Sequence, residues 1–199
     1  MPFDKRSSTG NTWVSHRHRA VVYMAEKCGT FSIVDALEDH DDWERFWKEF
    51  YELPRYEDYA RYGVVRNPYS RAVSYWAYWR KVNRAIVHDY TFAEHILKRV
   101  RGEAPALGDH AKSMHGWYRD VDLTHVLRFE NLSQEFNTLP FMAGRTLKHL
   151  NATEHDDWRS YYDSEELMEA VAAPAEQDFI VYGYDRHVRK HEVGRLCNA

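Results

Sequence analysis

A lysine, a glycine and two hydroxyl side chains lie close together in residues 26–32, Glu-Lys-Cys-Gly-Thr-Phe-Ser. Lys27 carries a positive charge, Thr30 and Ser32 can donate hydrogen bonds, and Gly29 lets a ligand approach the backbone closely. Together with backbone N–H groups, such residues are typical of a phosphate or other anion site. An ordinary strand-to-helix turn with a surface lysine would also explain this stretch, so on its own it leaves both interpretations open.

The elements on either side of this stretch favour an anion site. Residues 20–25 are a short apolar run with β-branched side chains, which predicts a buried strand. Apolar residues then recur at helical spacing from Phe31 to Leu37, so we expect a helix that begins near Thr30 and ends near Glu38. The first N–H groups of a helix have no partner within it, and together with the helix dipole they favour an anion.

A second polar stretch follows residues 62–65, another apolar run that predicts a buried strand. Arg66 comes directly after it, Pro68 is placed to open a helix, and Ser74 lies about two turns further on. Because ligands of open α/β sheets gather at the carboxyl ends of the strands, Arg66 is expected at a ligand site. The spacing leaves open whether Arg71 joins this site or packs against a helix end or an acid.

The rest of the chain predicts an α/β protein. Residues 125–129 predict a third strand, and helices are expected from about residues 91, 133 and 164. A capping-box pattern at Asp41, with aromatic residues at positions 43, 46, 47, 50 and 51, predicts an amphipathic helix that packs on the core or, alternatively, forms a wall or lid beside the substrate. Strands that alternate with helices imply right-handed βα units and a mainly parallel central sheet flanked by helices.

Length, charge and cysteine content narrow the class of protein. The 199 residues predict a single domain of residues 19–199 after a flexible N-terminal arm of residues 1–18. A net charge of −4 gives none of the basic excess of nucleic-acid binders. Cys28 and Cys197 show no disulfide or metal-ligand pattern. Without a signal peptide or an apolar run of about 18 residues, we expect a cytoplasmic protein with no membrane span.

Taken in order, these stretches resemble the carbohydrate-type sulfotransferases that use 3′-phosphoadenosine 5′-phosphosulfate (PAPS), in particular small bacterial members. The resemblance runs from about residue 21 to residue 184. Residues 26–32 are similar to the family's 5′-phosphosulfate loop, and residues 65–75, Val-Arg-Asn-Pro-Tyr-Ser-Arg-Ala-Val-Ser-Tyr, to its 3′-phosphate motif, although Asn67 stands where many members have Asp. Further segments have counterparts in the family: residues 125–132, 150–151, 161–162 and 178–184.

The resemblance implies a P-loop-like three-layer fold and transfer of a sulfuryl group from PAPS to an acceptor hydroxyl, most readily of a carbohydrate. The product would be 3′-phosphoadenosine 5′-phosphate (PAP), and no metal is needed. Lys27 would stabilise charge on the bridging oxygen, and Arg66 and Ser74 would hold the 3′-phosphate. The full set of expected nucleotide-binding residues is Lys27, Cys28, Gly29, Thr30, Phe31, Ser32, Arg66 and Ser74, with Lys148 and Arg159 as candidates to close over the nucleotide.

The acceptor hydroxyl also needs a catalytic base. His110 lies in Asp-His-Ala-Lys-Ser-Met, which resembles a family segment reading roughly Asp/Glu-His-x-x-Pro-Gln, with Ser113 and Met114 in place of Pro and Gln. His40 and Glu38 are rivals, because related enzymes place a base after the first helix.

Two other functions stay open. A kinase or another P-loop nucleotide-binding enzyme would share the strand, loop and helix, but Lys27 precedes Gly29, so the pattern Gly-x-x-x-x-Gly-Lys-Ser/Thr is absent. A non-catalytic module of the same fold could instead bind a glycan or a protein through its aromatic residues. Failure to bind PAP would favour this last alternative.

Overall fold

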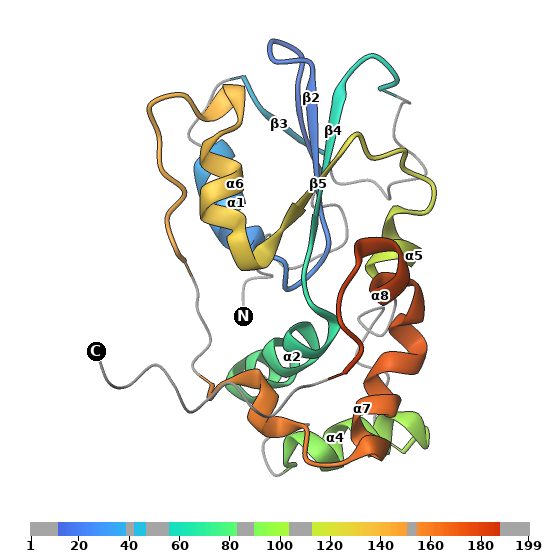
Figure 1. Ribbon diagram of the computed structural model, residues 1–199. Coiled ribbons are helices and arrows are strands. Elements are labelled where there is room, and N and C mark those ends of the chain that lie inside the picture. The colour runs from blue at the N-terminus through green and yellow to red at the C-terminus, as the bar shows by residue number, and fades with distance from the viewer. Residues whose placement is uncertain are drawn as a thin grey trace, which may run out of the picture. The chain divides into compact units, whose positions relative to one another are not determined.

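The computed structural model describes residues 12–38, 42–46, 56–82, 90–103, 113–150 and 155–187 of the chain. They pack as two compact units (Figure 1). Unit 1 comprises residues up to Arg66 together with residues 114–152, and it contains the β-sheet. Unit 2 comprises residues 67–113 and those from residue 153 on, and it is helical. The sequence-based assignment of residues 19–199 to a single domain stays a prediction.

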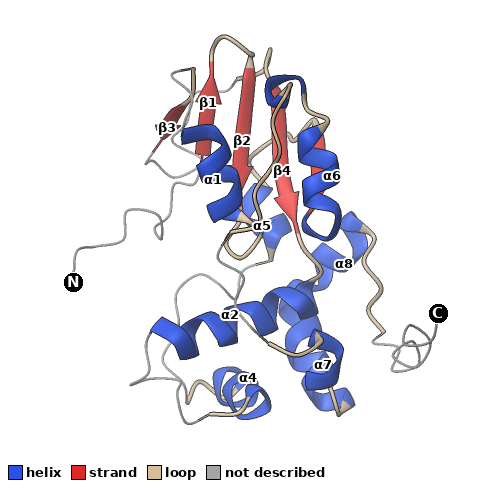
Figure 2. Ribbon diagram, turned by 90° about the vertical axis from the view of Figure 1, so that its left-hand side faces the viewer, coloured by secondary structure: helices blue, strands red, loops and turns tan. Residues whose placement is uncertain are grey.

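The sheet of unit 1 has five strands in the order β3-β1-β2-β4-β5. Strands β2 (Ala20–Met24), β4 (Ala60–Val65) and β5 (His125–Arg128) are parallel neighbours, which confirms the three strands expected from the sequence. The α/β class is confirmed as well. The expected mainly parallel sheet is not confirmed, because β1 pairs antiparallel with both β2 and β3 and the sheet is therefore mixed (Figure 2).

Two segments differ from the sequence-based expectations. Thr12–Ser15, which we expected in the N-terminal arm, forms strand β1 with all of its residues buried. Glu44–Phe46, which we expected in an amphipathic helix, forms strand β3 and pairs with β1 at the edge of the sheet. Pairing with a strand far away in the sequence has here overridden the helical spacing of the aromatic residues. Residues 47–51 of that expected helix lie outside the described residues.

Helices cover the sheet of unit 1. Helix α1 (Thr30–Glu38) and helix α6 (Leu132–Asn137) lie on one face, and the short helix α5 (Met114–Tyr118) lies on the other side (Figures 1 and 2). Helix α1 begins at Thr30 as expected and buries Ile33, Val34 and Leu37. The 3₁₀ turns Phe129–Asn131 and Pro140–Met142 flank α6. The turn between β2 and α1 lies at the carboxyl end of β2.

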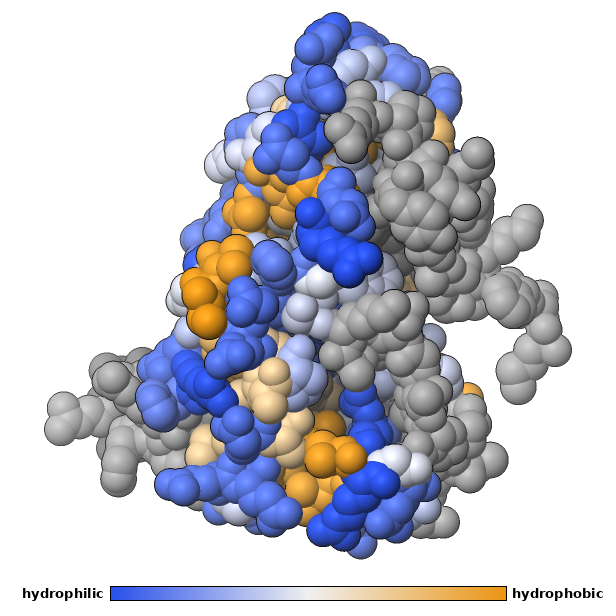
Figure 3. Space-filling model, turned by 90° about the vertical axis from the view of Figure 1, so that its right-hand side faces the viewer, coloured by the Kyte–Doolittle hydropathy of each residue, from blue (hydrophilic) through white to orange (hydrophobic). Residues whose placement is uncertain are grey.

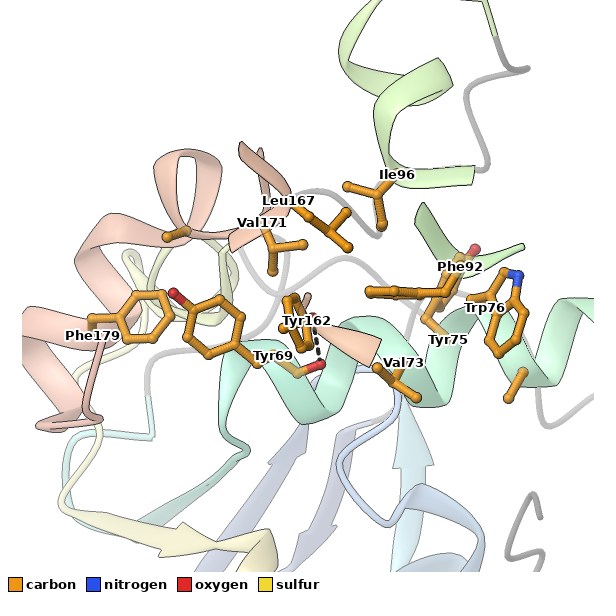
Figure 4. Packing of buried hydrophobic residues seen from close by; sticks show 12 residues of the cluster. Tyr69, Val73, Tyr75, Trp76, Phe92, Ile96, Tyr162, Leu167, Val171 and Phe179 are labelled. Carbon is orange, nitrogen blue, oxygen red and sulfur yellow. Dashed lines mark hydrogen bonds between the residues drawn. The ribbon is translucent and has the colours of Figure 1, made fainter. Parts of the chain in front are cut away.

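Unit 2 packs its helices around an aromatic core. It contains α2 (Pro68–Val82), α4 (Phe92–Val100), α7 (Glu165–Ala172) and α8 (Glu176–Tyr182), with 3₁₀ turns η5 (Trp158–Tyr161) and η6 (Ala173–Ala175). In the core, the Tyr162 hydroxyl donates to the Tyr69 carbonyl oxygen over 2.9 Å (Figure 4). The expected helix starts are confirmed, since Pro68 opens α2 and Thr91 forms a capping box with Glu94. No helix among the described residues is long and apolar enough to cross a membrane.

Candidate functional site

The turn between β2 and α1 has an unusual backbone. Lys27 has a φ of 63° and Gly29 a φ of 84°, both in the left-handed region. For lysine this conformation costs about 1–2 kcal/mol, whereas glycine adopts it readily. A strained residue of this kind, held by the surrounding structure, is a sign of a functional turn. The strain therefore falls on the lysine that the sequence singles out.

Gly29 is also fixed by a close neighbour. A Cβ atom added at this position would lie 2.6 Å from Cδ2 of Leu132, the first residue of α6. A side chain here would have to displace Leu132 and adopt an unfavourable φ. Glycine is therefore required both by the turn and by its packing against α6.

The start of α1 contains a buried hydroxyl that the described residues leave without a partner. The Thr30 hydroxyl is buried and has no hydrogen-bond partner among the described residues, and Thr30 as a whole is 9% exposed. Buried polar groups are nearly always hydrogen-bonded, and the start of a helix favours negative charge. An anion such as a phosphate or sulfate would satisfy this hydroxyl.

Arg66 adds a buried positive charge beside the turn. It follows β4 directly and is 7% exposed. Its Nη1 donates to the Lys27 carbonyl oxygen over 3.0 Å, and its guanidinium lies 4.1 Å from the centre of the Phe129 ring. Because a guanidinium keeps its proton, Arg66 brings a permanent charge to the carboxyl ends of two neighbouring parallel strands. The structure thus brings together Lys27 and Arg66, which the sequence places 39 positions apart.

Two residues that support the site, Tyr118 and Met114, are not predicted by the sequence. The Tyr118 hydroxyl accepts from the Ala25 backbone N–H over 2.7 Å and lies 2.9 Å from the Val64 carbonyl oxygen, so α5 joins the ends of β2 and β4. The Met114 sulfur accepts from the Arg66 backbone N–H over 3.2 Å. No local sequence pattern signals these roles, because both residues act through distant backbone groups.

Other predicted nucleotide-binding residues of unit 1 have definite partners. The Cys28 thiol is buried and lies 3.6 Å from the Met114 sulfur, so only the Cys28 backbone faces the turn. The Ser32 hydroxyl accepts from the Leu150 backbone N–H over 3.0 Å. Lys148 pairs with Asp35 of α1, with 3.1 Å between Nζ and Oδ2, on the exposed surface. Ser32 and Lys148 therefore tie the segment after α6 to α1.

The remaining candidates lie elsewhere. Ser74 is buried on α2 and belongs to unit 2. Arg159, also in unit 2, pairs with Asp157 at 3.2 Å and lies over the Trp158 ring. Both candidate bases, His110 and His40, lie outside the described residues, and Glu38 is exposed at the end of α1. Among the described residues, no group of three His, Cys, Asp or Glu side chains is placed to hold a metal ion.

The start of α2 differs from that of α1, because the side chain of Asn67 caps α2. Asn67 Oδ1 accepts from the backbone N–H groups of Tyr69 and Ser70, over 3.0 and 3.2 Å. Asn and Asp are equally good at this capping role. Asparagine at this position therefore preserves the helix start as well as an aspartate would.

Comparison of the chain with protein-family models, with curated proteins and with solved structures gives no significant match. The function must therefore be argued from the geometry of the turn and from the motifs themselves.

Proposed function

We propose that this protein is a sulfotransferase that moves a sulfuryl group from PAPS to an acceptor hydroxyl, most readily that of a carbohydrate. The observation that carries the proposal is the turn between β2 and α1. It combines a strained Lys27, a buried Thr30 hydroxyl with no hydrogen-bond partner in the described part of the chain, and the buried charge of Arg66. We infer in addition that the sheet unit is P-loop-like, with nucleotide phosphates at the carboxyl ends of β2 and β4.

In the proposed reaction the bond between sulfur and the bridging oxygen of PAPS breaks, and a bond forms between sulfur and the acceptor oxygen. PAP leaves with the electron pair, so negative charge grows on its 5′-phosphate. Lys27 and the donors at the start of α1 stabilise that charge, and Arg66 holds the 3′-phosphate. The acceptor proton passes to a base, for which His110 and His40 are the candidates. No metal takes part.

Calorimetric titration of the metal-free protein tests the nucleotide site. PAP should bind more tightly than ATP or adenosine 5′-phosphosulfate, because only PAP places phosphates at both the turn and Arg66. Arg66→Ala should abolish measurable binding, and Arg66→Lys should weaken it about tenfold, since lysine lacks the two-pronged guanidinium.

Arg17→Ala is the matched control, because it removes the same charge from the same unit. Arg17 precedes β2, at the strand end opposite the turn, and forms an exposed ion pair with Asp42 at 3.0 Å. PAP binding should be unchanged in this variant. Tighter binding of ATP than of PAP would instead support a kinase, and failure of all three nucleotides to bind would support a non-catalytic binding module.

A further inference from the structure

Unit 2 contains a cavity of about 620 Å³ among α2, α4, α7 and η6. Its walls are mostly apolar, with Tyr75 from α2, Ile96 and Leu97 from α4, and Val171 from α7. The described residues that line it all belong to unit 2. Over α4 and α7, Figure 3 shows apolar side chains at the surface between hydrophilic ones. The volume suits a small organic molecule, since such pockets measure roughly 300–1,000 Å³.

Two arginines bring positive charge to these apolar walls. Arg71 of α2 is 8% exposed, and Arg99 comes from α4, so the two charges reach the cavity from different helices. Two acids of α7 also line the cavity. Glu169 is already paired, because both of its carboxylate oxygens accept from Arg186 Nη2, over 2.8 and 2.7 Å. Glu166 is exposed.

Arg99 is the group that most needs a partner. Within the described part of the chain its guanidinium forms neither an ion pair nor a hydrogen bond. Burial lowers the pKa of its guanidinium, Tyr75 acts in the opposite direction, and the positive charge of Arg71 lowers the pKa further. A guanidinium nevertheless stays charged at neutral pH. The cavity wall therefore holds a partly desolvated cation that an anionic ligand would neutralise.

We propose that this cavity binds a small organic acid, whose carboxylate lies against Arg99 and Arg71 and whose apolar body fills the space between α2, α4 and α7. A carboxylate matches the planar, two-pronged donors of a guanidinium. The apolar walls favour a ligand with one charged group and a hydrocarbon or aromatic body rather than a sugar or a nucleotide. None of the residues assigned to PAPS lines the cavity, although Arg71 and Tyr75 lie within residues 65–75. The titrations below need no nucleotide.

Calorimetric titration with two acids and their neutral counterparts tests the charge requirement. The probes are decanoate with decan-1-ol, and 2-naphthoate with 2-naphthamide, which sample a flexible and a rigid apolar body. At least one acid should bind, and about tenfold more tightly than its neutral counterpart, as expected for a charged hydrogen bond. Equal binding of acid and neutral probe, or no binding of either acid, would overturn the proposal.

Two variants locate the binding site. Arg99→Met should weaken the acid about tenfold or more. Arg101→Met, which removes an exposed charge two residues further along and outside the cavity lining, should leave binding unchanged. Equal loss in both variants would show a general charge effect and refute the site. Ala170→Phe should fill the cavity and prevent binding of acid and neutral probes alike, and circular dichroism would confirm that each variant is folded. Displacement of the acid by PAP would also contradict a separate site.

Discussion

Two junctions of this protein follow the same plan, a parallel strand that leads into a helix, but they treat the start of the helix in opposite ways. After β4, Asn67 caps α2 and satisfies two backbone N–H groups with its own side chain. After β2, the chain strains Lys27, and the Thr30 hydroxyl is buried without a partner in the described part of the chain. In the first arrangement the chain's own side chain satisfies the helix start, whereas in the second the described residues leave the Thr30 hydroxyl free for a ligand.

The largest expected effect separates function from stability at the strained turn. Lys27→Gly should reduce the proposed sulfuryl transfer about 100- to 1,000-fold, because it removes the charge proposed to stabilise the transition state. The same change should raise the free energy of unfolding by about 1 kcal/mol, since glycine relieves the left-handed strain. Initial rates of PAP release from PAPS with a hydroxyl-bearing carbohydrate as acceptor, together with urea unfolding, measure the two effects. A variant that is less stable but equally active would show that Lys27 is structural.

A buried histidine makes unit 2 sensitive to acid. His95 is 1% exposed and its Nε2 has no partner among the described residues; burial, aided by the charge of Arg99, lowers its pKa to about 4. The unfolded chain takes up a proton below about pH 6.5 and the folded one only near pH 4, so stability falls as the pH drops through this window. The loss should reach about 3 kcal/mol by pH 4.

His95→Leu should abolish this part of the pH dependence. Urea unfolding at pH 7 and pH 4.5 provides the measurement. His187→Leu, an exposed change in the same unit, serves as the control. If the free energy of unfolding of His95→Leu fell with pH as it does in the unchanged protein, His95 would not be the source of the pH dependence. Such a result would mean that unit 2 contains another buried group that resists protonation.

Thr30→Val tests the unpartnered hydroxyl of the first junction. Valine has nearly the same shape, so without ligand the variant should be more stable by about 1 kcal/mol, because no buried hydroxyl is left unsatisfied. PAP should bind about tenfold more weakly. Thr30→Ser keeps the hydroxyl and should bind PAP like the unchanged protein. If Thr30→Val were to bind PAP equally well, the hydroxyl would have no part in the anion site.

Asn67→Ala tests the capped junction and should have the smallest effect. Loss of the cap should lower the free energy of unfolding by about 1 kcal/mol. Asn67→Asp should restore most of it, because an aspartate caps equally well. Thermal unfolding of the three proteins gives the comparison. A gain in stability on removal of Asn67 would contradict the assignment of this side chain as the cap of α2.

The sequence predicts local features of this protein well and distant pairings poorly. The start of α1 at Thr30 follows from apolar spacing, and that of α2 at Pro68 follows from the fixed φ of proline. Strand β3 could not be predicted, because Glu44–Phe46 is set by pairing with β1 rather than by its own residues.

The same limit applies to the candidate site. The sequence shows that residues 26–32 and 65–75 contain the charged and hydroxyl side chains of the site. The strain at Lys27 and the bond from Arg66 to its carbonyl oxygen are not visible, because they arise when β2 and β4 lie side by side. The supporting contacts of Tyr118 and Met114 depend on the same tertiary arrangement.

The buried thiol of Cys28 gives the turn a built-in reporter. Its sulfur lies against Met114 beneath the strained backbone and is 0% exposed. A thiol-reactive dye can reach it only when the turn opens, so in a Cys197→Ser background the labelling rate measures the free energy of local opening. Because a bound nucleotide would hold the turn closed, slower labelling would register occupancy without any knowledge of the acceptor.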